Sequence, residues 1–314
     1  MTQAPTHALT QPAPRAVIRA LRRLFAPLLA PLVALSLLAG CAVPPSDGPS
    51  TGAGARAEAD QSARLLAELR RRDMLIEDAR LNRYVAGMAS RLEPHRPRGA
   101  PRVRTFIVTD AEVNAFTSGA GYIFVHAGLL AAMENEAQFA MVLAHEIAHV
   151  DRGHVSQGMR QRQNVGLGAT ALAIGGALAG VPQQVTELAV GLGAQAVVAS
   201  YTREQETEAD LVGFRYLTAA GWNGAEGARS FEVMRKLYGE RSGVAQFFAT
   251  HPQSTERQAQ LTRLARAQGA DRGRVARPEW LRETAEIRRA TLQVYEAQGR
   301  NAEARHVRGL LRAR

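Results

Sequence analysis

The chain has 314 residues, of which 46% are hydrophobic and 22% are charged, and this ordinary balance excludes a fibrous or a wholly disordered protein. Aromatic residues make up only 5%, which argues against base stacking on single-stranded nucleic acid as the main function. The net charge of +10 is a modest excess that fits an anionic surface, and we expect no nucleic-acid partner. The single cysteine excludes an internal disulfide framework.

The start of the chain has the organisation of an export signal. Basic residues up to Arg23 precede an apolar run over residues 24–38, and small residues follow it before Cys41. This ending is similar to the signal of bacterial lipoproteins, in which the cysteine is lipidated and becomes the first residue of the mature protein. An uncleaved membrane anchor is the alternative, which the short run and its two prolines disfavour. Ala42 stands where the inner-membrane retention signal places Asp, so we expect a lipid-anchored protein on the periplasmic side, with the outer membrane favoured.

The next residues combine a linker with helical patterns. Residues 41–60, after the signal peptide over 1–40, hold the lipidated Cys41 and are rich in Pro, Gly, Ser and Ala, as expected of a flexible tether. From about Gln61 to Leu92 apolar residues recur at helical spacing and predict one or two amphipathic helices.

The β signal is confined to one stretch of about 20 residues. Residues 103–108 predict a strand, 113–116 a short extended piece, 118–121 a turn and 122–125 a second full strand. After Gly128 the pattern is helical almost to the end of the chain.

Two later regions have unusual composition. Residues 165–181 and 188–199 are nearly uncharged, and because each is short for a membrane span, buried or surface-inserted helices are favoured over a membrane hairpin. From about Pro278 to Arg314 the pattern predicts two Arg-rich helices joined near Gly299.

The chemical centre of the sequence is His145-Glu146-x-x-His149. On a helix, two histidines four residues apart lie on one face, so both imidazoles can bind one metal ion. Glu146 points about 100° around the axis and can reach a water at that metal. The surrounding residues are mostly apolar, and a polar patch on a buried helix needs partners, which favours a metal over two satisfied core histidines. The helix is predicted to begin at Asn135, with Gln138 as the capping-box partner, and to stop at Gly153.

A catalytic zinc needs a third protein ligand and an open position. His154 lies five residues after His149, and the residues around it do not match the metzincin pattern. Glu206 and Asp210 are again four residues apart, so one can bind the metal while the other accepts the second N–H of a ligating histidine. The small Gly213 allows this second helix to approach the first, whereas Glu208 has the pattern of a solvated face.

These motifs resemble the signature of the zinc metallopeptidases that include HtpX, the CaaX prenyl proteases, LoiP and BepA. The expected lipid anchor makes the chain similar to the lipoprotein branch around LoiP. Two further stretches match: Asn114-Ala115-Phe116, ahead of 121–125, and Thr250-His251-Pro252, followed by Arg257. The resemblance covers about residues 80–257.

The resemblance implies a role for each matching residue. One zinc ion per chain would be bound by His145, His149 and Glu206, with Glu146 as the general base. Asp210 would orient a ligating histidine, and His251, supported by Arg257, would lie over the open position as a fourth ligand or as an oxyanion donor. Asn114 and Ala115 would belong to the strand that binds the substrate backbone.

The implied fold is α+β and predominantly α-helical. A zincin-like metallopeptidase domain over residues 61–262, with a small β-sheet and the active-site helix, would precede a basic helical C-terminal extension over 263–314. The implied function is a membrane-tethered periplasmic zinc endopeptidase that hydrolyses misfolded or misassembled envelope proteins, with the outer-membrane assembly machinery as a candidate partner. The alternative is a zinc-stabilised chaperone or assembly factor with latent peptidase activity.

Overall fold

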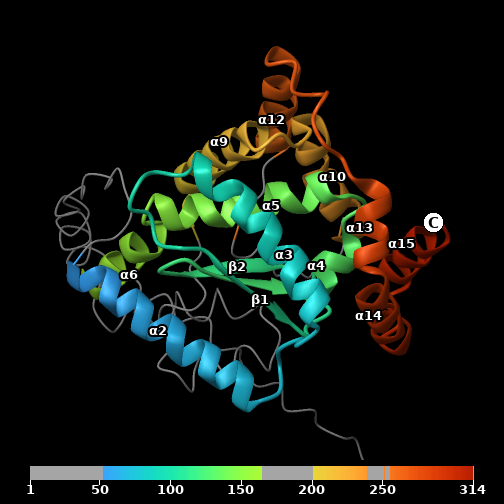
Figure 1. The fold of residues 1–314 in the computed structure, drawn as a ribbon, viewed down its shortest axis with the longest axis horizontal. Coiled ribbons are helices and arrows are strands. Elements are labelled where there is room, and N and C mark those ends of the chain that lie inside the picture. Colours follow the sequence, from blue (N-terminus) through green and yellow to red (C-terminus); the bar gives the residue numbers. More distant parts are fainter. Residues whose placement is uncertain (1–51, 165–200, 239–250, 252–254, 314) are drawn as a thin grey trace, which may run out of the picture. The chain divides into compact units, whose positions relative to one another are not determined.

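The computed structural model describes residues 52–164, 201–238, 251 and 255–313 (Figure 1). The expected signal peptide, Cys41 and the apolar residues 165–199 lie outside this part of the chain. None of the helices in the described part combines the length and the apolar composition that crossing a bilayer requires.

Three strands form a mixed sheet in the order β1–β3–β2. β1 (Arg104–Val108) runs parallel to β3 (Tyr122–His126), and β2 (Ala115–Gly119) runs antiparallel to β3. β2 therefore includes residues that the sequence pattern assigned to a turn over 118–121. The register shifts between Thr117 and Gly119, and Gly119 has a φ of 92°, which is the glycine conformation of a β-bulge. The bulge lets the strand continue where the composition predicted that it would end.

Helices cover both faces of this sheet (Figure 1). On one face, Ile123 and Val125 of β3 join the main core with α3 (Ala79–Leu92) and α5 (Glu136–Asp151). On the other face, Tyr122 and Phe124 pack with leucines of α2 (Gly52–Arg71). Because both faces are covered, β3 is buried along its whole length.

α2 begins at Gly52, so residues 52–60 form helix where the sequence pattern predicted tether. These residues contain several alanines, which are the strongest helix formers. Tertiary contacts also hold them: the buried Glu58 accepts a hydrogen bond from the Ala120 backbone at 3.0 Å, and the Ser62 and Ser118 hydroxyls lie 2.7 Å apart. The beginning of α2 is thereby joined to the turn between β2 and β3.

The other helices follow the predicted helical pattern. They are η1 (Glu93–His95), α4 (Ala127–Ala132), α6 (His154–Asn164), α9 (Arg203–Ala219), α10 (Gly224–Tyr238) and α12 (Thr255–Ala267). α9 packs along α5, and α10 and α12 pack together beside this pair (Figure 1). The boundary expected between residues 262 and 263 falls inside α12, so it does not coincide with a break in the structure.

Three C-terminal helices pack on α4 and α5. They are α13 (Arg277–Glu283), α14 (Ala285–Ala297) and α15 (Asn301–Arg312). The predicted junction near Gly299 is confirmed, but the sequence pattern predicted two helices where the structure has three, because a further break falls at Thr284. Trp280 is fully buried, stacks on Phe139 of α5 with ring centroids 5.1 Å apart, and donates to the Met133 carbonyl at 2.8 Å. The buried Arg288 donates to the carbonyls of Ala131 and Met133 at 2.5 and 2.6 Å. The basic extension is therefore part of the packed structure.

Candidate metal centre

The His-Glu-x-x-His motif lies on α5, and both predicted ends of this helix are confirmed. The Asn135 side chain accepts a hydrogen bond from the Gln138 backbone at 3.0 Å, and α5 ends before Gly153, whose φ is 64°. The Gln138 side chain accepts from the Glu134 backbone, so the reciprocal bond of the predicted capping box is made one residue earlier. Every residue of α5 is buried, which places the motif in the interior.

α9 approaches α5 closely at Gly213, as its small side chain predicted. A Cβ atom at this position would lie 2.9 Å from the His145 backbone nitrogen and 3.0 Å from Ala144. Thr202 and Gln205 form a capping box that begins α9, and the face of α9 toward α5 carries Glu206 and Asp210. The two motifs are brought together by this contact between helices.

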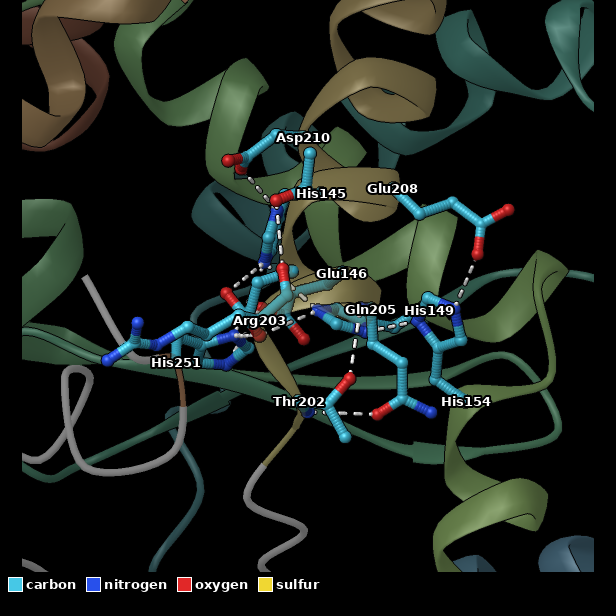
Figure 2. Close-up of polar contacts among 12 residues, drawn as sticks. His145, Glu146, His149, His154, Thr202, Arg203, Gln205, Glu208, Asp210 and His251 are labelled. Carbon is cyan, nitrogen blue, oxygen red and sulfur yellow. Dashed lines mark hydrogen bonds and ion pairs between the residues drawn. The ribbon is translucent and has the colours of Figure 1, made fainter. Parts of the chain in front are cut away.

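Four buried side chains converge between α5 and α9: His145, His149, Glu206 and His251 (Figure 2). The Nε2 atoms of His145 and His149 lie 3.0 Å apart, and Nδ1 of His251 lies 3.2 Å from Nε2 of His145. Glu206 lies 3.6 Å from His145 and 3.4 Å from His149, measured from carboxylate oxygen to Nε2. Its Oε1 is 2.9 Å from Nδ1 of His251.

These distances fit a zinc site. Four donors at about 2.0–2.1 Å from one zinc ion lie about 3.3 Å from each other at tetrahedral angles, close to the distances observed. Three imidazoles and a carboxylate are also a donor set that zinc prefers.

Charge supports the same conclusion. Glu146, Glu206 and Asp210 are buried and carry three negative charges when ionised, whereas the buried Arg257 supplies one positive charge. Buried charges need compensation, and a divalent cation would supply the two positive charges that are missing.

Glu146 lies next to the cluster and is fully buried. Its Oε1 is 3.4 Å from Nε2 of His251. Burial raises the pKa of Glu146, and the opposing effects of His251 and His145 leave it above its ordinary value. A carboxylate with a raised pKa is suited to accept a proton and to release it again.

Glu206 and His251 shift the pKa values of each other in opposite directions. Burial raises the pKa of Glu206, but His251 and His149 outweigh it and hold the pKa well below its usual range. Burial lowers the pKa of His251, but Glu206 and Glu146 outweigh it and raise the pKa above its ordinary value.

Asp210 and Arg257 lie where a second layer is expected. Oδ1 of Asp210 is 3.0 Å from Nδ1 of His145, the nitrogen that faces away from the cluster. Arg257 lies 2.6 Å from Oε2 of Glu206 and 2.6 Å from Oδ2 of Asp210. Arg257, expected to support His251, thus holds both acidic residues of the α9 motif in position.

Three residues around His149 were not predicted to lie there. Nδ1 of His154 is 2.8 Å from Nδ1 of His149, so His154 lies behind this ring and outside the cluster. Glu208, expected on a solvated face, is 3.0 Å from Nε2 of His154. Tyr201 stacks on His149 with ring centroids 3.7 Å apart. The spacing of His154 from His149 raises the possibility of a metal ligand and does not indicate a residue behind the His149 ring.

The predicted substrate strand corresponds to β2, which pairs only with β3 in the described sheet. The carbonyl of Asn114 accepts a hydrogen bond from the His126 backbone at 3.0 Å, so it is used within the sheet. Along an antiparallel strand, the N–H and C=O groups of successive residues point alternately toward the partner strand and away from it. Because Asn114 bonds to β3, the N–H and C=O groups of Ala115 and Thr117 point away from β3. Of the two predicted residues, Ala115 therefore directs its backbone groups away from β3, whereas Asn114 directs its carbonyl toward β3.

Comparison with known proteins matches the model of peptidase family M48 to residues 76–265. The chain is 30% identical over 192 residues to the beta-barrel assembly-enhancing protease of Escherichia coli (strain K12), covering 59% of this chain and 39% of that protein. It is 36% identical over 149 residues to the metalloprotease LoiP of the same organism, covering 46% and 56%. It is 28% identical over 151 residues to the mitochondrial metalloendopeptidase OMA1 of Arabidopsis thaliana, covering 48% and 29%. The matched part is thus less than two thirds of each relative.

Proposed function

The chain belongs to peptidase family M48, and we propose that it is a zinc endopeptidase that hydrolyses misfolded or misassembled proteins of the bacterial envelope. The observation that carries the proposal is the convergence of His145, His149 and Glu206 beside the buried Glu146. A metal-binding triad with a carboxylate next to it is the arrangement that zinc-dependent peptide hydrolysis uses.

Each residue has a task in this reaction. His145, His149 and Glu206 would hold a zinc ion, which would supply Lewis acidity toward a water molecule and the peptide carbonyl. Glu146 takes the proton of the attacking water and passes it to the departing amine. β2, through Ala115, pairs with the extended backbone of the substrate and aligns the scissile bond with Glu146. Asp210 holds His145 in the orientation needed for binding.

We further propose that the protein is tethered to a membrane through a lipid on Cys41 and works in the periplasm. The export signal and the small residues before Cys41 support the tether. The name of the beta-barrel assembly-enhancing protease, one of the relatives, supports envelope proteins as substrates and the outer-membrane assembly machinery as a partner.

A latent peptidase with chaperone activity is a second candidate, and one observation favours it. Nδ1 of His251 lies among the donor atoms, 2.9 Å from Oε1 of Glu206, so His251 can complete a four-donor site. A zinc site closed by four protein ligands has no open position, as in structural sites. In this alternative the protein binds unfolded substrates without cutting them until His251 moves.

Cleavage of unfolded casein by zinc-loaded protein, with and without a chelator, separates these functions. We expect chelator-sensitive cleavage by the wild type and a loss of at least about 10²-fold in Glu146→Gln, which keeps its zinc. Glu303→Gln is the matched control, since Glu303 is a buried glutamate of α15 that pairs with Arg300. Unchanged casein cleavage by Glu146→Gln would show that Glu146 is not the general base. Casein that is bound but not cut by the wild type would favour the latent form.

A further inference from the structure

The ring of His149 is contacted at both of its nitrogens. Nε2 faces the cluster, 3.0 Å from Nε2 of His145 and 3.4 Å from Oε1 of Glu206. Nδ1 faces away from it, 2.8 Å from Nδ1 of His154, and Nε2 of His154 lies 3.0 Å from Oε2 of Glu208. Figure 2 shows His149, His154 and Glu208 as a continuous series of contacts that leads away from the other histidines.

One arrangement of protons satisfies these contacts when His149 binds a metal through Nε2. An imidazole that binds through one nitrogen carries its proton on the other, so Nδ1 of His149 is a donor. Nδ1 of His154 must then accept, and Nε2 of His154 must carry the proton and donate to Glu208. In the opposite tautomer of His154, two N–H groups would face each other across 2.8 Å.

Glu208 is fixed in turn by a positive charge. Its Oε1 lies 2.6 Å from Nη2 of Arg152, which caps the C-terminus of α5. The side chains of Glu208 and Arg152 are 36% and 30% exposed, whereas that of His154 is 1% exposed. Water therefore solvates the charged pair of Glu208 and Arg152. The buried ring of His154 connects this pair to His149 in the metal centre.

We propose that His154, oriented by Glu208, is a positioning residue that selects the metal-binding tautomer of His149. Asp210 would favour the corresponding tautomer of His145, because its Oδ1 lies 3.0 Å from Nδ1 of that ring as an ion-pair contact and an ionised carboxylate can only accept. His154 can accept a hydrogen bond at Nδ1 only when its proton is on Nε2. Glu208 favours that tautomer because its carboxylate accepts a hydrogen bond from Nε2. Tyr201, whose ring is inclined by 17° to that of His149, fixes the plane of the ring. The inference rests on the zinc site of the proposed function, and not on peptide hydrolysis.

Nitrogen-15 NMR of the zinc-loaded wild-type protein tests the proton arrangement directly. We expect His154 to show the ring shifts of the Nε2–H tautomer. We also expect a scalar coupling between the Nδ1 atoms of His149 and His154 across their N–H···N hydrogen bond. A His154 ring with its proton on Nδ1 overturns the proposal.

His154→Phe keeps a ring at this position and removes both nitrogens. We expect its zinc dissociation constant, measured by competition with a chelating dye, to be about 10–100-fold higher than that of the wild type. His154→Gln returns a carbonyl acceptor and should restore part of the affinity. His306→Phe is the control, because His306 is a half-buried histidine that contacts the Ala132 carbonyl away from the cluster.

Zinc affinity of His154→Phe within a factor of about two of the wild type, with a native circular dichroism spectrum, overturns the proposal. If His154→Phe does not fold, the proposal is tested by the tautomer of His154 that NMR shows in the wild-type protein. Neither experiment measures proteolysis, so a failure of the proposed enzymatic function leaves these results unchanged.

Discussion

Replacing Gly213 by alanine tests whether the approach of α9 to α5 determines the geometry of the metal centre. The added methyl group would lie 2.9 Å from the His145 backbone nitrogen. Because carbon contacts are most favourable at about 3.5–4.0 Å, the two helices have to separate by roughly 0.6 Å. Glu206 lies two turns before Gly213 on the same face of α9, so the separation moves its carboxylate away from the two histidines of α5.

The magnitude follows from two opposing effects. Overpacking of this kind costs about 1–3 kcal/mol, whereas alanine is favoured over glycine inside a helix by up to about 1 kcal/mol. Gly87 in α3 is a matched control, since it is exposed and an added Cβ would have no neighbour within 4 Å. We expect the free energy of unfolding to rise in Gly87→Ala and to fall in Gly213→Ala. The two variants should differ in this free energy by about 1–3 kcal/mol.

Urea unfolding in the presence of a chelator measures both free energies without a contribution from bound zinc. The zinc dissociation constants of the same variants then report the displacement of Glu206, and we expect weaker binding only in Gly213→Ala. If the two variants have the same stability and the same zinc affinity, the contact between α9 and α5 does not constrain the site and the reasoning is refuted.

Two further substitutions test polar groups around the sheet and the cluster. His251→Ala leaves three donors, so zinc should stay bound while casein cleavage changes, and a collapse of the zinc content would identify His251 as an essential ligand. His126→Phe removes a fully buried ring whose nitrogens have no hydrogen-bond partner in the described part of the chain, since Asp110 is 3.9 Å away, and the free energy of unfolding should rise. Burial holds the folded-state pKa of His126 below its ordinary 6.5, so the unfolded chain takes up this proton first as the pH falls. The wild type should therefore lose stability relative to His126→Phe from about pH 6.5 downward, and parallel pH profiles in urea unfolding would contradict this.

The centre of the site could be predicted because its geometry is local. His145 and His149 lie one helical turn apart on any helix, and Asn135 and Gly153 mark the ends of that helix by ordinary capping chemistry. The resemblance to a known family implied that Glu206 binds the same metal as His145 and His149. The small Gly213 indicated that the helix carrying Glu206 could approach the helix of the two histidines closely.

The surroundings of His149 could not be predicted by the same reasoning. His154 follows Gly153, whose left-handed backbone ends the helical period, so spacing from His149 no longer indicates where its ring points. Glu208 has the exposure of a surface residue and still contacts His154, because the rotation of α9 against α5 brings it there. Such contacts depend on tertiary packing and leave no periodic signal.

The beginning of α2 shows the same limit in the fold. A stretch rich in Ala and Gly is typical of a linker, yet here it forms helix. Part of the reason is the contact of Glu58 with Ala120, 62 residues further along the chain. The boundary expected after residue 262 likewise falls within a helix, since α12 continues through it.

The packing of Trp280 and Arg288 has a practical consequence for producing the protein. A chain trimmed to end at residue 265, where the family match stops, would lose both side chains. The Ala131 carbonyl would lose its arginine donor, and the Phe139 ring would become open to water six residues before His145 on the same helix. Inactivity of such a shortened sample would reflect damage to α5, so assays and crystallisation should begin from protein that keeps its C-terminal residues.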